Sequence, residues 1–266
     1  MPQFTHHAPG TFSWPELATT DQKGAVAFYR SLFGWTVNDQ PIGPNDMYSL
    51  LQLNGSDVGA AYTMREDERK MNIPPHWNNY VTVANVDEST KRAKELGAQV
   101  LAGPFDVMDA GRMSVLKDPT GAVFQLWQAG RSIGAKTLAE PGALCWTELT
   151  TSDPAAAEKF YVALLGWTPK HSAAAVAPMA YTEFSVQGGD RPMAGMMAKP
   201  PHMPPDMPSF WLPYFMVTDV DASVATATSL GGKAHVGPQD IPGTGRFAVV
   251  ADPQGAAFAV FAPAAR

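Results

Sequence analysis

The chain has 266 residues, of which 45% are hydrophobic and 17% are charged, and this supports one or two compact domains. The formal net charge is −6 and there is no basic run, which argues against nucleic acid as a partner because phosphate binding needs clustered Lys and Arg. No apolar stretch approaches the roughly 20 residues of a membrane span, so no membrane partner is expected.

The first elements in the chain are predicted to be a strand, a helix and two further strands. Residues 12–19 are strand-like. Asp21 can cap a helix that runs to Phe33, and Gly34 stands where a left-handed C-cap is expected. Strands over 48–53 and 58–62 follow, joined by the turn Asn54-Gly55.

The same order recurs after a loop around Pro74-Pro75. A strand over 79–84 precedes a helix over 87–96, which Gly97 ends. Further strands are expected near residue 100, over 113–117 and over 123–128, with the turn Asp118-Pro-Thr-Gly121 between the last two. The first half of the chain therefore reads as two βαβββ modules.

The second half of the chain repeats the first. SWPELATTD at 13–21 returns as CWTELTTSD at 145–153, and four later motifs return at a similar offset: FY, GW, GR and DPxG. Such a repeat decides the architecture. It predicts two domains, residues 9–129 and 141–263, joined by a linker at 130–140. A solenoid would show shorter, uniform repeats, so it is not the favoured interpretation.

The motifs W-x-E-L-x-T-x-D, W-x-x-Y and G-R…D-P-x-G-A-x-F resemble the vicinal-oxygen-chelate superfamily. This superfamily includes glyoxalase I, extradiol dioxygenases and the bleomycin- and fosfomycin-resistance proteins, and the chain is most similar to its tandem-domain actinobacterial glyoxalase-like group. The resemblance implies an α+β fold with four βαβββ modules, paired into two glyoxalase-like domains. Each domain would form a U-shaped mixed sheet around a cup that binds ligands.

The resemblance also locates the positions at which metal-dependent members carry their ligands. In the first domain these positions hold Trp14, Ala60 or Ala61, Asn78 and Gln125; in the second they hold Trp146, Gly195 or Met196, Leu212 and Ala259. A divalent ion usually needs three or four nitrogen or oxygen donors. No metal cofactor is therefore expected, and only a Glu16, Asn78 and Gln125 set in the first domain stands as an alternative.

Glu16 and Glu148 are the candidate catalytic residues. Each lies two positions after the tryptophan of its strand and so shares its face. The glutamates could act as general bases or bind a hydroxyl or cationic group of a ligand. The alternative is a structural role, in which the carboxylate bonds backbone amides or the repeated arginine.

The candidate ligand-binding residues are polar or aromatic, and most recur in both halves: Trp14, Asn78, Tyr80, Arg112, Gln125, Trp146, Tyr214 and Arg246. The arginines could clamp a carboxylate, and a salt bridge at the surface or between modules is the alternative. The two tryptophans could pack in the core or form a stacking platform for a planar ligand.

The favoured hypothesis is a protein that binds a small aromatic or apolar organic molecule in its cups without a metal, as resistance proteins do. The alternative is a metal-dependent lyase or dioxygenase of the glyoxalase I type that uses the first-domain cup, and a third is a fold that serves assembly. Whether a reaction is catalysed stays open, as does the choice between monomer and homodimer. Cys145, the only cysteine, and an N-terminus without a secretory pattern indicate a cytoplasmic protein.

Overall fold

The computed structural model describes residues 3–44, 46–172, 180–189 and 191–264. The first module is made of β1 (Phe12–Thr19), α1 (Gln22–Phe33), β2 (Thr36–Pro41), β3 (Met47–Leu53) and β4 (Ser56–Thr63). The short helix α2 (Glu66–Lys70) leads to the second module, made of β5 (His76–Thr82), α3 (Val86–Glu95), β6 (Gln99–Val107), β7 (Gly111–Lys117) and β8 (Val123–Ala129).

The second half of the chain has the same order of elements. Its third module contains β9 (Leu144–Thr151), α4 (Pro154–Leu165), β10 (Thr168–Ser172), β11 (Tyr181–Ser185) and β12 (Pro192–Ala198). Its fourth module contains β13 (Phe210–Met216), α5 (Val220–Ser229), β14 (Lys233–Ile241), β15 (Gly245–Ala251) and β16 (Ala257–Pro263). No helix in these described ranges is long and apolar enough to cross a membrane.

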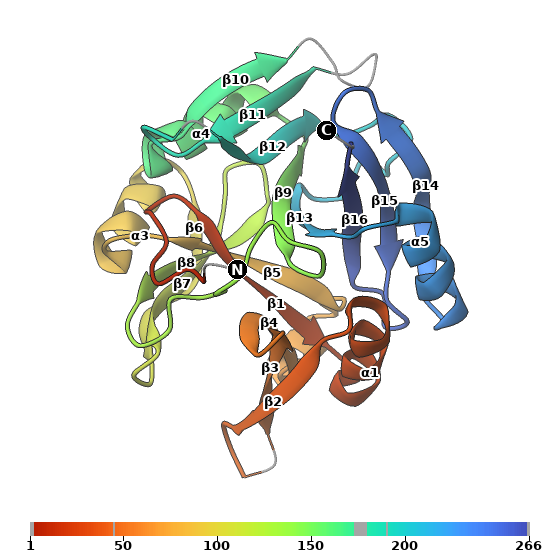
Figure 1. The fold of residues 1–266 in the computed structure, drawn as a ribbon. Helices are drawn as coiled ribbons and strands as arrows, with labels where there is room; N and C mark the ends of the chain where they lie inside the picture. The colour runs from red at the N-terminus through yellow and green to blue at the C-terminus, as the bar shows by residue number, and fades with distance from the viewer. Residues whose placement is uncertain (1–2, 45, 173–179, 190, 265–266) are drawn as a thin grey trace.

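Each half builds one eight-stranded mixed sheet (Figure 1). The strand order is β2-β3-β4-β1-β5-β8-β7-β6 in the first sheet and β10-β11-β12-β9-β13-β16-β15-β14 in the second. The two modules of a sheet meet where β1 pairs antiparallel with β5, and β9 with β13. The outer neighbours β4 and β12 run parallel to β1 and β9. This is the expected arrangement of four modules in two sheets.

Local sequence signals position the first helix of each half. The Asp21 side chain accepts a hydrogen bond from the Gly24 amide at 2.9 Å, and α1 ends at Gly34 with φ at 72°. In the second half, Asp153 accepts from the Ala156 amide at 3.0 Å, and Gly166 ends α4 with φ at 69°. Glycine adopts this left-handed conformation without the penalty that a Cβ brings.

Three details of the first half differ from the expectation. The edge strand β2 (Thr36–Pro41) is largely exposed and polar, so it carries no apolar alternation that would reveal it. The helix α2 (Glu66–Lys70) is short and charged, and the Glu68 side chain caps it by accepting from the Arg65 amide at 2.8 Å. Strand β5 begins at His76 rather than at residue 79, because its pairing with β1 extends to Ala18.

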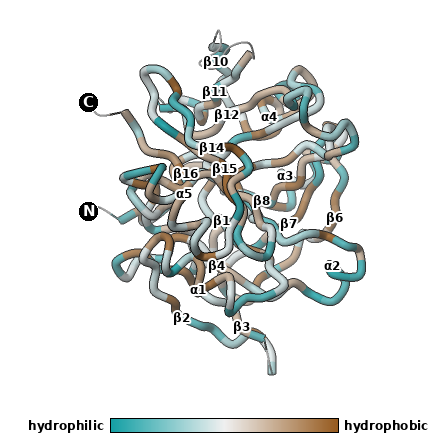
Figure 2. Tube along the Cα trace, turned by 90° about the vertical axis from the view of Figure 1, so that its right-hand side faces the viewer, coloured by the Kyte–Doolittle hydropathy of each residue, from teal (hydrophilic) through white to brown (hydrophobic). Residues whose placement is uncertain are grey.

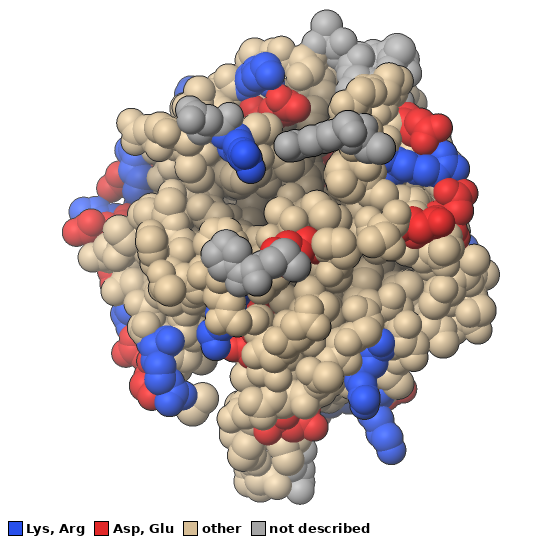
Figure 3. Space-filling model, viewed as in Figure 1, with Lys and Arg blue, Asp and Glu red and all other residues tan. Residues whose placement is uncertain are grey.

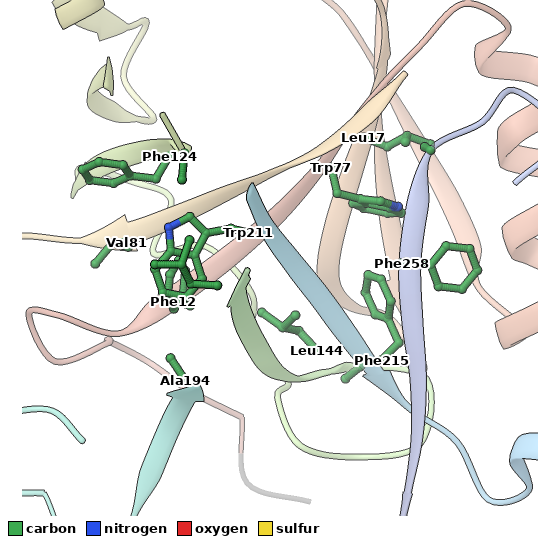
Figure 4. Close-up of a cluster of buried hydrophobic side chains, with 14 of the residues drawn as sticks. Phe12, Leu17, Trp77, Val81, Phe124, Leu144, Ala194, Trp211, Phe215 and Phe258 are labelled. Atoms are coloured by element: carbon green, nitrogen blue, oxygen red, sulfur yellow. The ribbon is translucent and has the colours of Figure 1, made fainter. Parts of the chain in front are cut away.

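One hydrophobic core joins the two halves. Figure 2 shows hydrophobic segments on the interior strands and hydrophilic ones in outer loops and around α2. In the close-up of Figure 4, Trp77 of the first half lies against Phe215 and Phe258 of the second. The ring centroids of Trp77 and Phe215 are 5.1 Å apart, and a single cluster of buried side chains contains all three residues. The two sheets are thus packed together by aromatic burial.

Reciprocal hydrogen bonds complete this contact between the halves. Tyr29 of α1 donates to the Asp252 carboxylate at 3.1 Å, and Tyr161 of α4 donates to Asp118 at 2.8 Å. Each aspartate opens the D-P-x-G turn of the opposite half and also accepts backbone amides within that turn. The repeated FY and DPxG motifs therefore hold the two halves to each other.

Candidate ligand-binding cups

The face of each sheet that does not carry the helices forms a candidate site. In the first sheet we call this face the first cup; it is lined by Trp14, Glu16, Tyr80, Gln125 and Trp127. In the second sheet we call it the second cup; it is lined by Cys145, Trp146, Glu148, Tyr214 and Phe261. The core residues of the same strands alternate with these positions and point to the opposite face.

Glu16 lies at the centre of the first cup, with only 8% of the residue exposed. Its carboxylate accepts hydrogen bonds from the Tyr48 hydroxyl at 2.7 Å and the Tyr80 hydroxyl at 2.8 Å. The Asn78 side-chain amide adds a third donor at 3.2 Å. Among the described residues Glu16 has no ion-pair partner, so neutral donors alone solvate this buried carboxylate.

The hydrogen bonds continue on both sides of Glu16. The Trp14 indole donates to the Tyr48 hydroxyl at 3.1 Å. On the other side, the Gln125 amide donates to the Asn78 side-chain oxygen at 2.7 Å, and the Gln125 oxygen accepts from the backbone amide of residue 79 at 3.0 Å. The three residues proposed as an alternative metal set therefore lie together, but they are linked to one another by hydrogen bonds.

The second cup repeats the centre of this network. Glu148 accepts from the Tyr181 hydroxyl at 2.7 Å and from the Tyr214 hydroxyl at 2.8 Å, while the Trp146 indole donates to Tyr181 at 3.0 Å. Leu212 stands opposite Glu148, where Asn78 stands opposite Glu16. The second cup therefore keeps the carboxylate, the two tyrosines and the tryptophan, and lacks the third donor.

Sequence reasoning missed one tyrosine in each cup. Tyr48 and Tyr181 bridge the tryptophan and the glutamate, yet they lie in strands β3 and β11, away from the repeated motifs. Tyr181 follows Tyr48 by 133 residues, within the same offset as the rest of the repeat. That offset was the available signal, although the residues around the two tyrosines differ.

Burial governs the ionisation of these groups. It raises the pKa of the Glu16 carboxyl, and the donated hydrogen bonds partly oppose this rise. Burial raises the pKa of Glu148 in the same way. The pKa values of Tyr80 and Tyr214 lie well above the ordinary value because of burial and the neighbouring carboxylate. The phenols consequently stay protonated and act as donors.

The repeated arginines are not in the cups. Arg112 precedes the cup residue Met113 and points to the helix side of the sheet, where it pairs with Asp87 at 2.8 Å and Asp106 at 2.9 Å. Arg246 pairs in the same way with aspartates of α5 and β14, at 2.7 and 2.8 Å. These ion pairs tie each helix to the hairpin beside it, and the carboxylate clamp stays a prediction for these arginines.

The residues at the superfamily's ligand positions do not fit a metal ion. In the first cup, the oxygens of Asn78 and Gln125 already accept hydrogen bonds, and Glu16 is the only carboxylate. In the second cup, Leu212 and Ala259 supply no donor atom. Across the described ranges, no three His, Cys, Asp or Glu side chains are grouped to hold an ion. Oxygen-ligated metals need several free donors that converge on one point.

Outside the cups, two hollows occur on the surface. One lies between the N-terminal segment, α3 and Leu165, and the other lies beside the β14–β15 turn around Gly243. In the first, the Asn85 side chain is engaged as the N-cap of α3. The view of Figure 3 places most charged side chains near the outline of the molecule and leaves the middle of that face largely uncharged. Charge therefore gives no sign of a polyanion-binding face there.

The fold and the sequence motifs together define the class of protein to which this chain belongs. The sequence matches the model of the Glyoxalase/Bleomycin resistance protein/Dioxygenase superfamily over residues 11–126 and 143–260, so the chain belongs to this superfamily. It is 44% identical over 266 residues to "Putative glyoxylase CFP32" of Mycobacterium tuberculosis, with 99% of each chain covered. It is also 35% identical over 277 residues to "Anthracycline biosynthesis protein DnrV" of Streptomyces peucetius, covering 96% of this chain and 94% of that protein.

Solved structures share the fold. The Mn(II)-bound glyoxalase from Novosphingobium aromaticivorans superposes with a TM-score of 0.66 at 13% identity, over 96% of this chain and 82% of that one. The 2,3-dioxygenase LapB from Pseudomonas sp. KL28 gives a TM-score of 0.65 at 12% identity, over 97% and 94%. At such identities the similarity concerns the arrangement of modules, and activity has to be argued from the cups of this chain.

Proposed function

We propose that this protein binds a small aromatic organic molecule in its cups without a metal ion. The observation that carries the proposal is the repeated unit of one tryptophan, two tyrosines and one glutamate. In the second cup these are Trp146, Tyr181, Tyr214 and Glu148, joined by hydrogen bonds of 2.7 to 3.0 Å. The unit occupies the part of the sheet where metal-dependent members of the superfamily carry their ion.

The chemistry of the unit suits an aromatic ligand with a polar substituent. The tryptophan and tyrosine rings offer large flat surfaces that favour stacked or edge-to-face contact with another ring. The glutamate can accept a further hydrogen bond from a hydroxyl or amine of the ligand. Since burial raises the pKa of Glu148, this carboxyl is also suited to take a proton from a bound donor.

The relatives support the same ligand class. The Streptomyces peucetius protein is described as acting in anthracycline biosynthesis, and anthracyclines are polycyclic aromatic compounds. Its similarity covers 96% of this chain, so it includes both cups. The binding role of Trp14, Asn78, Tyr80, Gln125, Trp146 and Tyr214, and the proton-accepting role of Glu16 and Glu148, are part of this proposal.

Fluorescence titration with an anthracycline tests the proposal. Ligand stacked against the cup is expected to quench tryptophan emission with saturation, both before and after treatment with a chelator. Asp240→Asn, which alters an exposed carboxylate outside the cups, serves as the control. Binding that disappears on chelation and returns with a divalent ion would contradict the metal-free proposal, as would a lack of saturable quenching.

A further inference from the structure

The two cups differ in how far they are covered. In five pairs of equivalent positions, the residue of the first cup is buried and that of the second is only partly buried. The pairs are Ser13 and Cys145, Trp14 and Trp146, Glu16 and Glu148, Met113 and Phe247, and Trp127 and Phe261. Because the repeat gives both cups the same strands, the difference comes from what lies over them.

The segment that follows β8 covers the first cup. The Ala135 amide donates to the Ser13 carbonyl at 2.7 Å, and the Trp127 indole donates to the Ser132 carbonyl at 3.0 Å. Ala135 is fully buried in the same cluster as Trp14 and Tyr80. Residues 130–138, which we call the covering segment, therefore close the first cup by direct packing and by backbone hydrogen bonds to β1.

Further contacts hold the covering segment in place. The Lys136 amide donates to the Asp57 carbonyl at 2.7 Å, and the two side chains form an ion pair at 2.9 Å. The His7 ring lies 2.7 Å from the Ala135 carbonyl and stacks on Phe4, which places the N-terminal segment on top. The described residues place no comparable segment against β9 and β16 in the second cup.

The second cup also differs in chemistry. Glu183 stands in register with Gly195 and Glu148 across β11, β12 and β9, so the second cup carries two carboxylates on one face. The equivalent row of the first cup contains Leu50 and Ala60 beside its single glutamate. Within the described ranges, Glu183 forms an ion pair with the exposed Lys170 at 3.6 Å.

Gly195 has a specific role in the second cup. A Cβ at this position would overlap the Tyr181 hydroxyl, which donates to Glu148. The tyrosine therefore reaches the carboxylate by lying across a glycine. The first cup has Ala60 at the equivalent place, so alanine is compatible with this strand position.

We infer that the second cup is the ligand site of this chain and takes an aromatic molecule whose hydrogen-bond donor, a hydroxyl or ammonium group, reaches Glu148. The inference rests on the proposed function and narrows it to one cup. The partly buried rings of Trp146, Phe247 and Phe261 pack against the cluster of Tyr214, whose hydroxyl donates to Glu148. A ligand there contacts aromatic faces and replaces the donor that Asn78 supplies in the first cup.

Binding measurements on the full chain with three related naphthalene probes test this inference. The probes are naphthylmethylamine, naphthalenemethanol and methylnaphthalene, followed by calorimetry or fluorescence. One site per chain is expected, and the amine or the alcohol should bind at least about tenfold more tightly than methylnaphthalene. The stronger of the two identifies ammonium or hydroxyl as the preferred donor.

Variants locate the site. Glu148→Gln should weaken the preferred donor probe about tenfold and leave methylnaphthalene within about twofold. Glu95→Gln, which removes an exposed carboxylate from α3, is the control and should leave the stoichiometry unchanged and the affinity within about twofold, while Glu16→Gln reports on the first cup. Circular dichroism verifies that each variant is folded.

The outcomes separate the two proposals. If wild-type protein binds no probe and no anthracycline, the proposed function itself fails. If the probes bind but Glu16→Gln abolishes binding while Glu148→Gln does not, the second-cup inference is overturned and aromatic binding stands. Two equivalent sites per chain, or equal affinity for all three probes, would also overturn it.

Discussion

A carboxylate that accepts hydrogen bonds from two phenols lies at the centre of both cups. Glu16 and Glu148 each accept two tyrosine hydroxyls at 2.7 or 2.8 Å and have no ion-pair partner among the described residues. Hydrogen bonds to a charged acceptor are stronger than neutral ones. Burial without a cation nevertheless disfavours the ionised form, which makes these groups sensitive to pH.

Stability should therefore depend on the ionisation of Glu16. Its pKa in the folded chain is raised above the ordinary value of 4.5, which applies to the unfolded chain. At a pH between these two pKa values, the folded chain therefore binds more protons than the unfolded chain. The stabilising contribution of this carboxyl to the free energy of unfolding is fully present below pH 4.5. It is lost as the pH rises through the folded pKa. We expect Glu16→Gln to become more stable relative to wild type across that window.

Urea unfolding of both proteins from about pH 4 to about pH 8 measures this difference in free energy. Glu95→Gln, which removes an exposed carboxylate from α3, is the matched control. A Glu16→Gln difference that stays constant, or moves in favour of wild type at higher pH, would contradict the assignment.

The residues of the cups were only partly predictable. Trp14, Glu16 and Tyr80 could be placed on one face because strands alternate and the halves share their motifs. Tyr48 joins this group only through the pairing of β3 with β4, which the period of a single strand does not encode. The position of Arg112 on the helix side likewise depends on where β7 begins.

At the scale of elements, the repeat and the capping residues were sufficient to predict the helices and most strands. The polar strand β2 and the charged helix α2 were not predicted, because neither buries an apolar stripe. The course of residues 130–138 across the first cup could not be predicted either. Those residues have no periodicity of their own, and their position follows from backbone contacts with Ser13 and Asp57.

Gly134 lies close to β1 in the covering segment. Its φ is 95°, and a Cβ would lie 2.6 Å from the Ser13 carbonyl oxygen. Gly134→Ala should lower the free energy of unfolding by about 1–3 kcal/mol and increase acrylamide quenching of tryptophan, since the segment has to lift. Both are measured against wild type.

Gly55→Ala provides the control for this substitution. Gly55 has φ at 78°, and a Cβ there would meet nothing within 4 Å. The control therefore carries the strain of the left-handed backbone without the contact. If the two variants lose equal stability and quench equally, the covering segment does not depend on close approach at Gly134.

At the scale of the whole molecule, the two halves should unfold together. Their shared aromatic core and the bonds from Tyr29 to Asp252 and from Tyr161 to Asp118 cross between the sheets. Urea transitions followed by far-ultraviolet circular dichroism and by tryptophan fluorescence are expected to coincide. Separate transitions would show that the contact between the halves is weaker than this core implies.

The crossing hydrogen bonds should be costly to remove. Tyr29→Phe removes the hydroxyl that donates to Asp252 Oδ2 and leaves the Trp77 indole without its acceptor. We expect a loss of about 1–3 kcal/mol in the free energy of unfolding, and a similar loss for Tyr161→Phe. Urea denaturation measures both variants. If the free energy of unfolding falls by less than about 0.5 kcal/mol, the contact between the two halves is stabilised by the aromatic rings alone.

The reciprocity of these bonds has a consequence for the origin of the chain. The first half alone carries both a donor, Tyr29, and an acceptor, Asp118. Two copies of such a half, related by a twofold axis, would reproduce both crossing bonds, which is the self-complementarity of an isologous dimer. The tandem chain thus has the form of a fused homodimer, in which each half supplies one donor and one acceptor to its neighbour.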